Sequence, residues 1–546
     1  MTARVSFYGG LGEIGANMAS VEVDGRLAIL DVGLTFPDAE HYGIDLILPD
    51  WAPLRDRADD VDCVVITHGH EDHMGALPFF LRDFNNITVY ASRLTCGLLE
   101  AKLTEHPDTS ADLRVVEAGD RITTGPFDVE FVGVTHSIPD GFGVAFHTPD
   151  GTILHSGDFK LDQTPIDGKP TDLPHLAELG DAGVALLLAD STNADTSGHT
   201  KTERSVGKTL RDTFAEAGGR IVVTTFASHV HRVQQIIDAA IQTSRQICFV
   251  GRSMVRNMPI ARDLGYLTYD PAAVVEIHEV DNLARDGVVI ICTGSQGEPY
   301  AALSLMAAGQ HRQVQLQAGD TVVMASSVIP GNEAAIFKSI NGLSRQGARV
   351  VHKGIADVHV SGHAAADELR YYHNIVRPKA FVPVHGEYRH MVAHAEIARS
   401  TGLAADRVFV CEDGDTVELT DGVVGRGPSF TAGRVFVDGL GVGDVGSAVL
   451  RDRGKLSSEG VCVAVIVIDG HARLVSEPQI VQQGVIYEPE QAQLLDLAAK
   501  VLSEELRAGR DSDGAVIRRT TAQTLARFWR EQTGRRPVIL PLLVEL

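Results

Sequence analysis

The segment Thr67-His68-Gly69-His70-Glu71-Asp72-His73 constrains this chain more than any other. It follows directly on the mostly apolar run 61–66, which is typical of a buried strand. Ligands on the short loop after such a strand cannot all point one way, so His68 and His70 should share one face, with Asp72 and His73 further round. Neutral imidazole and carboxylate are the ligands of zinc and similar divalent ions. The spacing therefore predicts two adjacent cation sites.

Further candidate ligands stand where other predicted strands leave the core. They are His136 after the alternating run 127–134, Asp158 after the apolar run 152–154, and His385 after the apolar run 381–384. Taken alone, each histidine is more often a hydrogen-bonded structural residue. Asp158 is the best candidate for a bridging ligand, because two carboxylate oxygens can hold two cations. His155 should still lie on its strand and is not expected to be a ligand.

These motifs resemble those of the β-CASP group of metallo-β-lactamase-fold nucleases, and within that group the bacterial ribonuclease J family. The matches to the general fold are Asp31, the segment from His68 to His73, His136 and Asp158. The matches to the β-CASP additions are Asp190, Ser361-Gly362-His363-Ala364 and Pro383-Val384-His385-Gly386. Segments 9–15, 293–299 and 329–333 resemble ribonuclease J in particular. One position departs from that family, His229, where asparagine is expected.

The resemblance implies an α/β fold: a metallo-β-lactamase αββα sandwich with an inserted β-CASP α/β domain and a small C-terminal α/β domain. The patterning agrees, since strands dominate the start of the chain and alternate with helices after residue 204. Glycines recur between residues 421 and 460, which indicates a linker. We expect the sandwich at 1–204 and 350–440, the β-CASP domain at 205–349, a linker at 441–460 and the C-terminal domain at 461–546.

Hydrophobic periodicity locates the main elements. In the sandwich, helices are predicted at 75–84 and 95–103. The insert should contain helices at 206–216, 230–242 and 332–346 and strands at 220–225, 246–250, 288–292 and 321–325. The C-terminal domain should contain strands at 461–469 and 537–543 and helices at 490–508 and 515–532.

The resemblance also implies a set of roles. One divalent ion would bind His68, His70 and His136, a second would bind Asp72, His73 and His385, and Asp158 would bridge them, with Asp31 orienting the ligands. Zinc is the first expectation for both ions, with manganese or magnesium as alternatives. A hydroxide held between the ions would attack the phosphodiester and leave a 5′-phosphate. His363 would protonate the leaving oxygen or hold a phosphate, and Asp190 would complete the catalytic set with Asp72 and Asp158.

The activity implied is that of a 5′-to-3′ exoribonuclease with endoribonuclease activity in RNA processing, rRNA maturation and mRNA decay. The expected partner is single-stranded RNA, preferably 5′-monophosphorylated. Candidates for a 5′-phosphate pocket are Ser228 and His231, at the start of a predicted helix, together with Ser361, Gly362, His363 and Ala364. Ordinary capping and packing explain Ser228 and His231 about equally well. A homodimer or homotetramer is also implied.

Other functions stay open at this stage. A small-molecule metallo-hydrolase shares the first metal loop but lacks the long insert and the motifs around His363 and His385. A non-catalytic partner in an RNA-decay assembly would be expected to have lost ligands, and a β-CASP DNA nuclease would not share the ribonuclease J-like segments. The glycines at 10, 12 and 15 match a dinucleotide fingerprint, but a hairpin at Asp24-Gly25 is predicted where that motif requires a helix.

Composition limits the partners and the compartment. The formal net charge of −24 argues against a broad nucleic-acid-binding surface, so RNA should bind in a confined groove near the metals. The six cysteines show no ligand or disulfide spacing and are expected to be core residues in a reducing, cytoplasmic protein. We expect neither a signal peptide nor a membrane span, since no apolar run approaches the ~20 residues that a span needs. The arginines between 518 and 536 suggest a solvated helix face, or else a contact with RNA or a subunit.

Overall fold

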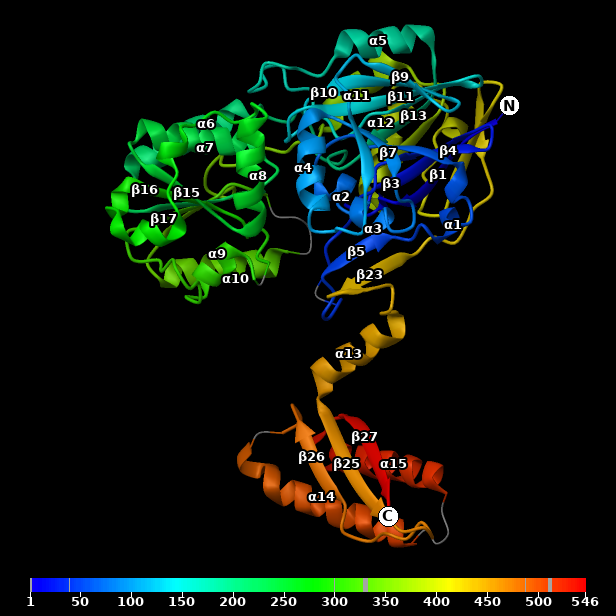
Figure 1. Ribbon diagram of the computed structural model, residues 1–546, viewed down its shortest axis with the longest axis vertical. Coiled ribbons are helices and arrows are strands. Elements are labelled where there is room, and N and C mark those ends of the chain that lie inside the picture. Colours follow the sequence, from blue (N-terminus) through cyan, green and yellow to red (C-terminus); the bar gives the residue numbers. More distant parts are fainter. Residues whose placement is uncertain (1, 39, 299, 328–331, 487, 509–512) are drawn as a thin grey trace. The chain divides into compact units, whose positions relative to one another are not determined.

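The computed structural model describes residues 2–38, 40–298, 300–327, 332–486, 488–508 and 513–546 (Figure 1). By its internal contacts the chain divides into two compact units. The first unit contains Met1–Phe36 and Ile47–Val435, and the second contains Pro37–Leu46 and Phe436–Leu546. Within the ribonuclease J-like segments, Pro299 and residues 329–331 lie outside the described residues.

Two sheets packed face to face form the centre of the first unit. The larger has the order β22-β21-β1-β3-β4-β6-β7-β8 and the smaller the order β19-β13-β12-β11-β10-β9. The strands of the larger sheet are β1 (Thr2–Gly9), β3 (Met18–Val23), β4 (Arg26–Leu30), β6 (Val61–Val65), β7 (Ile87–Ala91), β8 (Ala111–Val115), β21 (Thr416–Thr420) and β22 (Val423–Arg426). Those of the smaller are β9 (Arg121–Thr124), β10 (Phe127–Val134), β11 (Gly141–Thr148), β12 (Gly151–His155), β13 (Val184–Asp190) and β19 (Phe381–Val384). Alternate side chains from both sheets, among them Val21 and Phe131, share one buried core.

Helices complete the αββα sandwich. The outer face of the smaller sheet packs on α5 (Leu173–Ala182), α11 (Ala366–Val376) and α12 (Tyr388–Ser400), which place Leu176, Tyr372 and Ile397 in one cluster with strand residues. The other helices of the sandwich are α1 (Ala52–Arg55), α2 (Glu71–Met74), α3 (Leu77–Phe80) and α4 (Arg93–Leu103). The helix predicted over 75–84 is only the single turn α3. Residues 75–81 of this run are all buried, so the apolar residues show no helical period there.

The glycine-rich loop near the N-terminus leads into a hairpin. Strands β3 and β4 pair antiparallel, and Asp24 and Gly25 at their turn have φ of 52° and 78°, the conformation of a type I′ turn. The predicted hairpin therefore stands where the dinucleotide fingerprint requires a helix. Instead β2 (Leu11–Gly12) pairs in parallel with β20 (Gly386–Glu387), which places the loop beside His385.

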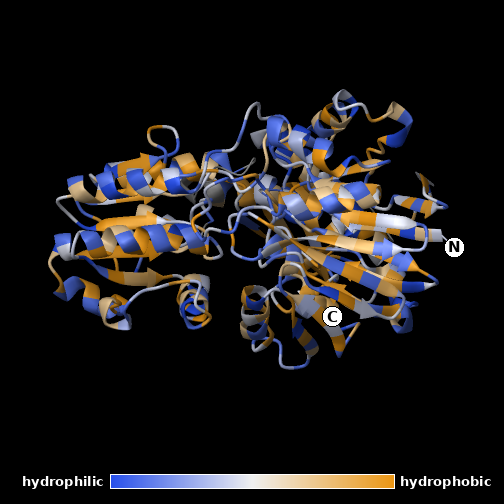
Figure 2. Cartoon of the chain, turned by 90° about the horizontal axis from the view of Figure 1, so that it is seen from above, coloured by the Kyte–Doolittle hydropathy of each residue, from blue (hydrophilic) through white to orange (hydrophobic). Residues whose placement is uncertain are grey.

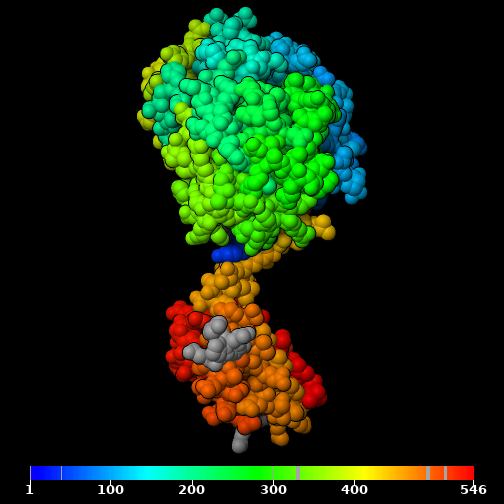
Figure 3. Space-filling model, turned by 90° about the vertical axis from the view of Figure 1, so that its left-hand side faces the viewer, coloured from blue at the N-terminus to red at the C-terminus, as the bar shows by residue number. Residues whose placement is uncertain are grey.

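The insert is a parallel α/β layer. Its sheet has the order β15-β16-β14-β17-β18, with every pair parallel. Its elements are α6 (Arg204–Glu216), β14 (Ile221–Thr224), α7 (Val230–Gln242), β15 (Gln246–Val250), α8 (Arg252–Asp263), β16 (Val288–Cys292), α9 (Ala302–Ala307), β17 (Thr321–Met324), α10 (Glu333–Arg345) and β18 (Arg349–His352). The strands are hydrophobic and lie between helices with hydrophilic outward sides (Figure 2). Figure 3 shows the surface that this insert forms, in green.

One expected boundary of the insert falls inside its sheet. Strand β18 pairs with β17 through His352, whereas the sequence suggested that the sandwich resumes at 350. We therefore propose that the insert ends after His352.

The second unit contains a three-stranded sheet with helices on one side. Its elements are α13 (Ser447–Glu459), β25 (Val461–Ile468), β26 (Gln479–Gln483), α14 (Glu488–Ala508), α15 (Gly514–Thr533) and β27 (Val538–Glu545). Ala464, Leu502 and Trp529 form its core. Most of the expected linker is helix α13. Two of its glycines, Gly446 and Gly460, cap that helix at its two ends.

The remaining short elements are β5 (Leu46–Pro49), β23 (Arg434–Asp438), β24 (Gly441–Val442) and the 3₁₀ turns Ala58–Asp60, Pro271–Ala273, Ile277–Asn282, Arg285–Gly287 and Ala405–Arg407. Within the described ranges, no helix combines the length and the apolar character needed to cross a bilayer.

Candidate metal centre

Three histidines from two strand ends converge at the top of the sandwich. His68 and His70 follow β6, and His136 follows β10. The Nδ1 atom of His70 lies 3.0 Å from Nε2 of His68 and 3.2 Å from Nε2 of His136. His136 donates its Nδ1–H to the carbonyl of Gly362 at 2.9 Å, so its Nε2 carries the free lone pair. Burial holds the pKa of His68 and of His136 well below the usual range, so both rings are neutral, as cation ligands must be.

A second cluster lies next to the first. It contains Asp72, His73, Asp158 and His385, whose ligand atoms lie within 4.8 Å of one another. Asp158 Oδ2 is 3.2 Å from Nε2 of His73, and Asp158 Oδ1 is 2.8 Å from Nδ1 of His385. The second ring nitrogen of His385 lies 3.4 Å from Asp72 Oδ2. His385 reaches this position with a φ of 50°, a left-handed conformation at the end of β19.

Asp158 stands between the two clusters. Its Oδ2 atom is also 3.8 Å from Nε2 of His68 and 3.8 Å from Nε2 of His136. Both Asp158 Oδ2 and His385 Nε2 are buried without a hydrogen-bond partner. A buried polar atom without a partner is costly, and a divalent cation would satisfy both atoms. The side chains therefore fit a binuclear cation site.

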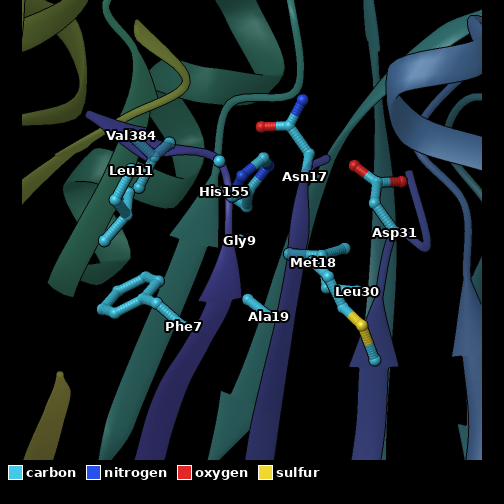
Figure 4. Close-up of a pocket in the computed structure, with 11 residues that line it drawn as sticks. Phe7, Gly9, Leu11, Asn17, Met18, Ala19, Leu30, Asp31, His155 and Val384 are labelled. Carbon is cyan, nitrogen blue, oxygen red and sulfur yellow. The ribbon is translucent and has the colours of Figure 1, made fainter. Parts of the chain in front are cut away.

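Hydrogen bonds from residues outside the two clusters orient the ligand side chains. Asp31, with a φ of 58° after β4, accepts hydrogen bonds from Thr67 N at 2.8 Å and from Nδ1–H of His73 at 2.8 Å. The bond to His73 turns the lone pair of its Nε2 toward Asp158. Asn17, which the sequence did not indicate, donates from Nδ2 to the backbone carbonyl of Asp72 at 3.0 Å. Asn17, Asp31 and His155 lie at one end of a small cavity of about 20 Å³ (Figure 4).

This support predicts the effect of Asp31→Asn. The carboxamide keeps the shape but loses the charge that fixes the ring of His73, so affinity for divalent metal should fall by about 10–100-fold. Competitive titration of the metal-free protein with zinc and a chromophoric chelator measures the change. An affinity equal to that of the wild type would show that Asp31 does not orient a ligand.

His363 approaches the centre from the segment that follows the insert. Its Nδ1–H donates to Asp190 Oδ2 at 2.8 Å, and the same Nδ1 lies 3.9 Å from Asp158 Oδ2. Burial alone lowers the pKa of His363, but the charge and hydrogen bond of Asp190 and the charge of Asp158 outweigh it and raise the pKa above 6.5. The ring can therefore hold a proton on Nε2. Asp190 ends β13, and its backbone N–H donates to Ser156 Oγ at 3.0 Å.

The loop that carries His363 is held closely against the first cluster. A Cβ atom on Gly362 would lie 2.7 Å from Cε1 of His136, so only glycine fits there. Asn193 donates from Nδ2 to Ser361 Oγ at 2.8 Å and to the carbonyl of His363 at 3.0 Å. Ala364, at the end of this loop, is buried. Asn193 was not indicated by any motif, because its partners lie far along the chain.

Ser228 and His231 stand at the beginning of α7. Ser228 is half-buried, and His231 Nε2 lies 3.7 Å from Asp167 Oδ2. In the part of the chain that the structure describes, neither side chain hydrogen-bonds to the loop 361–364. His229, the departure from the expected asparagine, is the N-cap residue of α7 and is buried.

Family models match the chain in four segments. They are the beta-lactamase superfamily domain at 35–225, the ribonuclease J beta-CASP domain at 218–343, the Zn-dependent metallo-hydrolase RNA specificity domain at 347–410 and the ribonuclease J C-terminal domain at 448–546. The expected fold class is thereby confirmed.

Characterised relatives match along the whole chain. Ribonuclease J of Mycolicibacterium smegmatis is 44% identical over 100% of this chain and 97% of its own length. The protein named Ribonuclease J2 of Bacillus subtilis is 38% identical over 100% of this chain and 98% of its own length. A solved structure of a protein of unknown function from Enterococcus faecalis V583 superimposes with a TM-score of 0.53 at 15% identity, covering 77% of this chain and all of its own. That likeness shows the fold alone.

These matches decide between the functions left open by the sequence. They favour neither a small-molecule hydrolase nor a DNA nuclease, and the described clusters retain each ligand type that a metallo-hydrolase needs. The resemblance inferred from the motifs is confirmed, and with it the binding of divalent metal. The chain belongs to the ribonuclease J family of metal-dependent nucleases.

Proposed function

We propose that this protein is a 5′-to-3′ exoribonuclease with endoribonuclease activity, acting on single-stranded RNA in RNA processing, rRNA maturation and mRNA decay. The observation that carries the proposal is the position of Asp158, which lies within 3.9 Å of both ligand clusters and of His363. A phosphodiester beside Asp158 would meet cations on one side and a proton donor on the other. The names of the relatives and the RNA specificity domain support RNA as the substrate.

We assign two ions per chain, with zinc as the first choice because the description of one matching family model names it. One would be held by His68, His70 and His136, the other by Asp72, His73 and His385, with Asp158 shared and Asp31 orienting His73. When bound, the ions supply Lewis-acid stabilisation of the phosphate charge and lower the pKa of water.

The chain's own groups then handle the leaving group. His363 would carry a proton on Nε2 and deliver it to the 3′ oxygen, so that the downstream product keeps a 5′-phosphate. Asp190 holds the opposite nitrogen of the ring at 2.8 Å and keeps the ring in that tautomer. Gly362 lets the loop approach the first cluster closely enough for this geometry.

The 5′ end of RNA would bind one nucleotide beyond the centre. Ser228 lies two residues before α7, a helix of 13 residues, and His231 lies in its first turn. The N-terminus of this helix carries a partial positive charge suited to phosphate. The loop from Ser361 to Ala364 would form the other side. Such a pocket favours a monophosphate, since a triphosphate would add charges without partners.

The second unit supports self-association. Alternate residues of β25 face the helices, and the opposite face of the sheet is apolar and exposed at Val481, Leu540, Leu542 and Val544. A second copy of this chain is the occupant we propose for this face, which gives a homodimer or, with a further contact, a homotetramer.

The six free, buried cysteines are consistent with a reducing compartment such as the cytoplasm.

The function is tested with one RNA sequence carrying a 5′-monophosphate, a 5′-triphosphate or a 5′-hydroxyl, labelled at either end. We expect mononucleotides to be released first from the 5′ end, fastest on the monophosphate, with slower internal cuts. A DNA strand of the same sequence serves as the comparison for the DNA nuclease alternative. Release from the 3′ end first, equal rates on all three RNAs, or faster cleavage of DNA would contradict the proposal.

A further inference from the structure

One buried arginine contacts both segments that connect the insert to the sandwich. Arg232, in the first turn of α7, has 0% of its surface exposed. Its Nε and Nη2 donate to the two carboxylate oxygens of Glu203 at 2.8 and 2.6 Å. Glu203 ends the segment that leads from the sandwich into the insert, immediately before α6. This is a bidentate pair, the arrangement that fixes orientation as well as distance.

The other donors of Arg232 reach the segment that returns to the sandwich. Nη1 donates to the carbonyl of Ala325 at 2.7 Å and to Nδ1 of His359 at 2.6 Å, and Nη2 donates to the carbonyl of Val360 at 3.4 Å. Arg232 therefore contacts both connections between the two domains, as well as the end of β17.

The protonation of His359 follows from this contact. A guanidinium can only donate, so Nδ1 of His359 must accept, and the hydrogen stands on Nε2. Nε2–H then donates to Ser327 Oγ at 2.9 Å. Burial and the charge of Arg232 both hold the pKa of His359 well below the usual range, which keeps this neutral form. The neutral His359 is therefore held in a fixed position between Arg232 and Ser327.

The same network continues to the metal centre. Glu203 N donates to Asp162 Oδ2 at 3.1 Å, and the buried Lys160, two residues after Asp158, lies 3.5 Å from the same oxygen. On the other side, Val360 directly precedes Ser361. Ser228 and His231 both precede Arg232, at the start of α7. Each residue proposed to bind the 5′-phosphate therefore lies within a few positions along the chain of Arg232 itself or of Val360, which Arg232 contacts.

We propose that Arg232 is a positioning residue that sets the preference for the 5′ end of the substrate. It fixes Ser228 and His231 relative to the loop of Ser361 and His363, and so sets the distance from the 5′-phosphate to the leaving-group acid. The inference rests on the proposed function. A buried ion pair is weak evidence for stability, because desolvation offsets the attraction, so the benefit expected from this pair is geometric.

The test compares Arg232→Lys and Arg232→Met with Arg245→Met. Arg245 is a matched control, because it is also buried in the insert and donates to the carbonyls of Gly219 and Ala217 at 2.8 and 2.6 Å, away from both connections. For each variant, kcat and KM are measured on RNA with a 5′-monophosphate and with a 5′-hydroxyl. Hydrolysis of bis(4-nitrophenyl) phosphate reports on the metal centre without a 5′ end.

We expect the ratio of kcat/KM between the two RNAs to fall by roughly 10–10²-fold in both Arg232 variants, since a misplacement of about 1 Å costs about that much. Lysine should not restore the ratio, because an ammonium lacks the planar fork. Hydrolysis of the small diester should fall much less, and Arg245→Met should keep the wild-type ratio.

Two results would overturn the inference. One is a wild-type ratio in the Arg232 variants. The other is an equal loss on both RNAs and on the small diester, which would assign Arg232 a structural role only. If Arg232→Met does not fold, Glu203→Gln, which weakens the same pair without changing its shape, is subject to the same criteria. A wild-type protein without any preference for the monophosphate would instead contradict the proposed function itself.

Discussion

Replacement of Asp158 by asparagine is expected to lower the hydrolysis of RNA by at least about 10³-fold and to reduce the metal content of the purified protein. The carboxylate lies between the two ligand clusters, so the variant loses a negative charge that both cations would share. Stabilisation of charge by metal ions is worth several kcal/mol, and ~4 kcal/mol corresponds to ~10³-fold in rate. Steady-state kinetics and elemental analysis of the same samples measure the two effects.

Asp150→Asn is the control for this experiment. Asp150 is also a buried carboxylate and accepts a hydrogen bond from the backbone of Asp421 at 3.0 Å, outside the ligand clusters. It should keep wild-type activity and two ions per chain. Full activity and unchanged metal in Asp158→Asn, or a single ion in the saturated wild-type protein, would rule out the binuclear assignment.

Replacement of His363 by alanine should reduce turnover by roughly 10²–10⁴-fold, the range for loss of a general acid. Its metal content should stay at the wild-type level, because His363 is hydrogen-bonded to Asp190 and is not among the assigned ligands. The kcat of the variant and its zinc content by mass spectrometry are the two measurements.

His175→Ala provides the comparison for His363. His175 pairs with Glu130 at 2.8 Å on the sandwich, away from the clusters, and its removal should change neither quantity. Loss of metal in His363→Ala would make His363 a ligand, which its place in a third group with Asp158, Asp190 and His385 allows geometrically.

Local patterns were sufficient to predict much of the fold. Helix α7 and strand β15 have the predicted bounds. The amphipathic pattern of the helix and the short apolar run of the strand are both visible in the local sequence. Helix α8 was not predicted, since Pro259 interrupts its pattern. Strand β26 was also not predicted, because three of its five residues are glutamines and leave too short an apolar pattern.

The residues of the site also fall into two groups, those that local motifs indicate and those that depend on long-range contacts. The histidines and carboxylates that form the two clusters occur in compact motifs at strand ends, so the sequence alone indicates them. Asn17, Glu203 and Arg232 belong to no motif. Their roles depend on partners that the fold brings from elsewhere in the chain, such as the carbonyl of Asp72 for Asn17 and Val360 for Arg232. Long-range hydrogen bonds of this kind leave no local signal.

The order of the ligands along the chain has a consequence for biosynthesis. The first cluster is complete once His136 has been made, but the second requires His385, about 300 residues after His73. Domains fold as the chain emerges, and contacts between distant residues form last. A nascent chain that stops before residue 385 therefore lacks one member of the second cluster. We expect the nuclease to become active only late in translation, and a truncation upstream of His385 to yield an inactive protein.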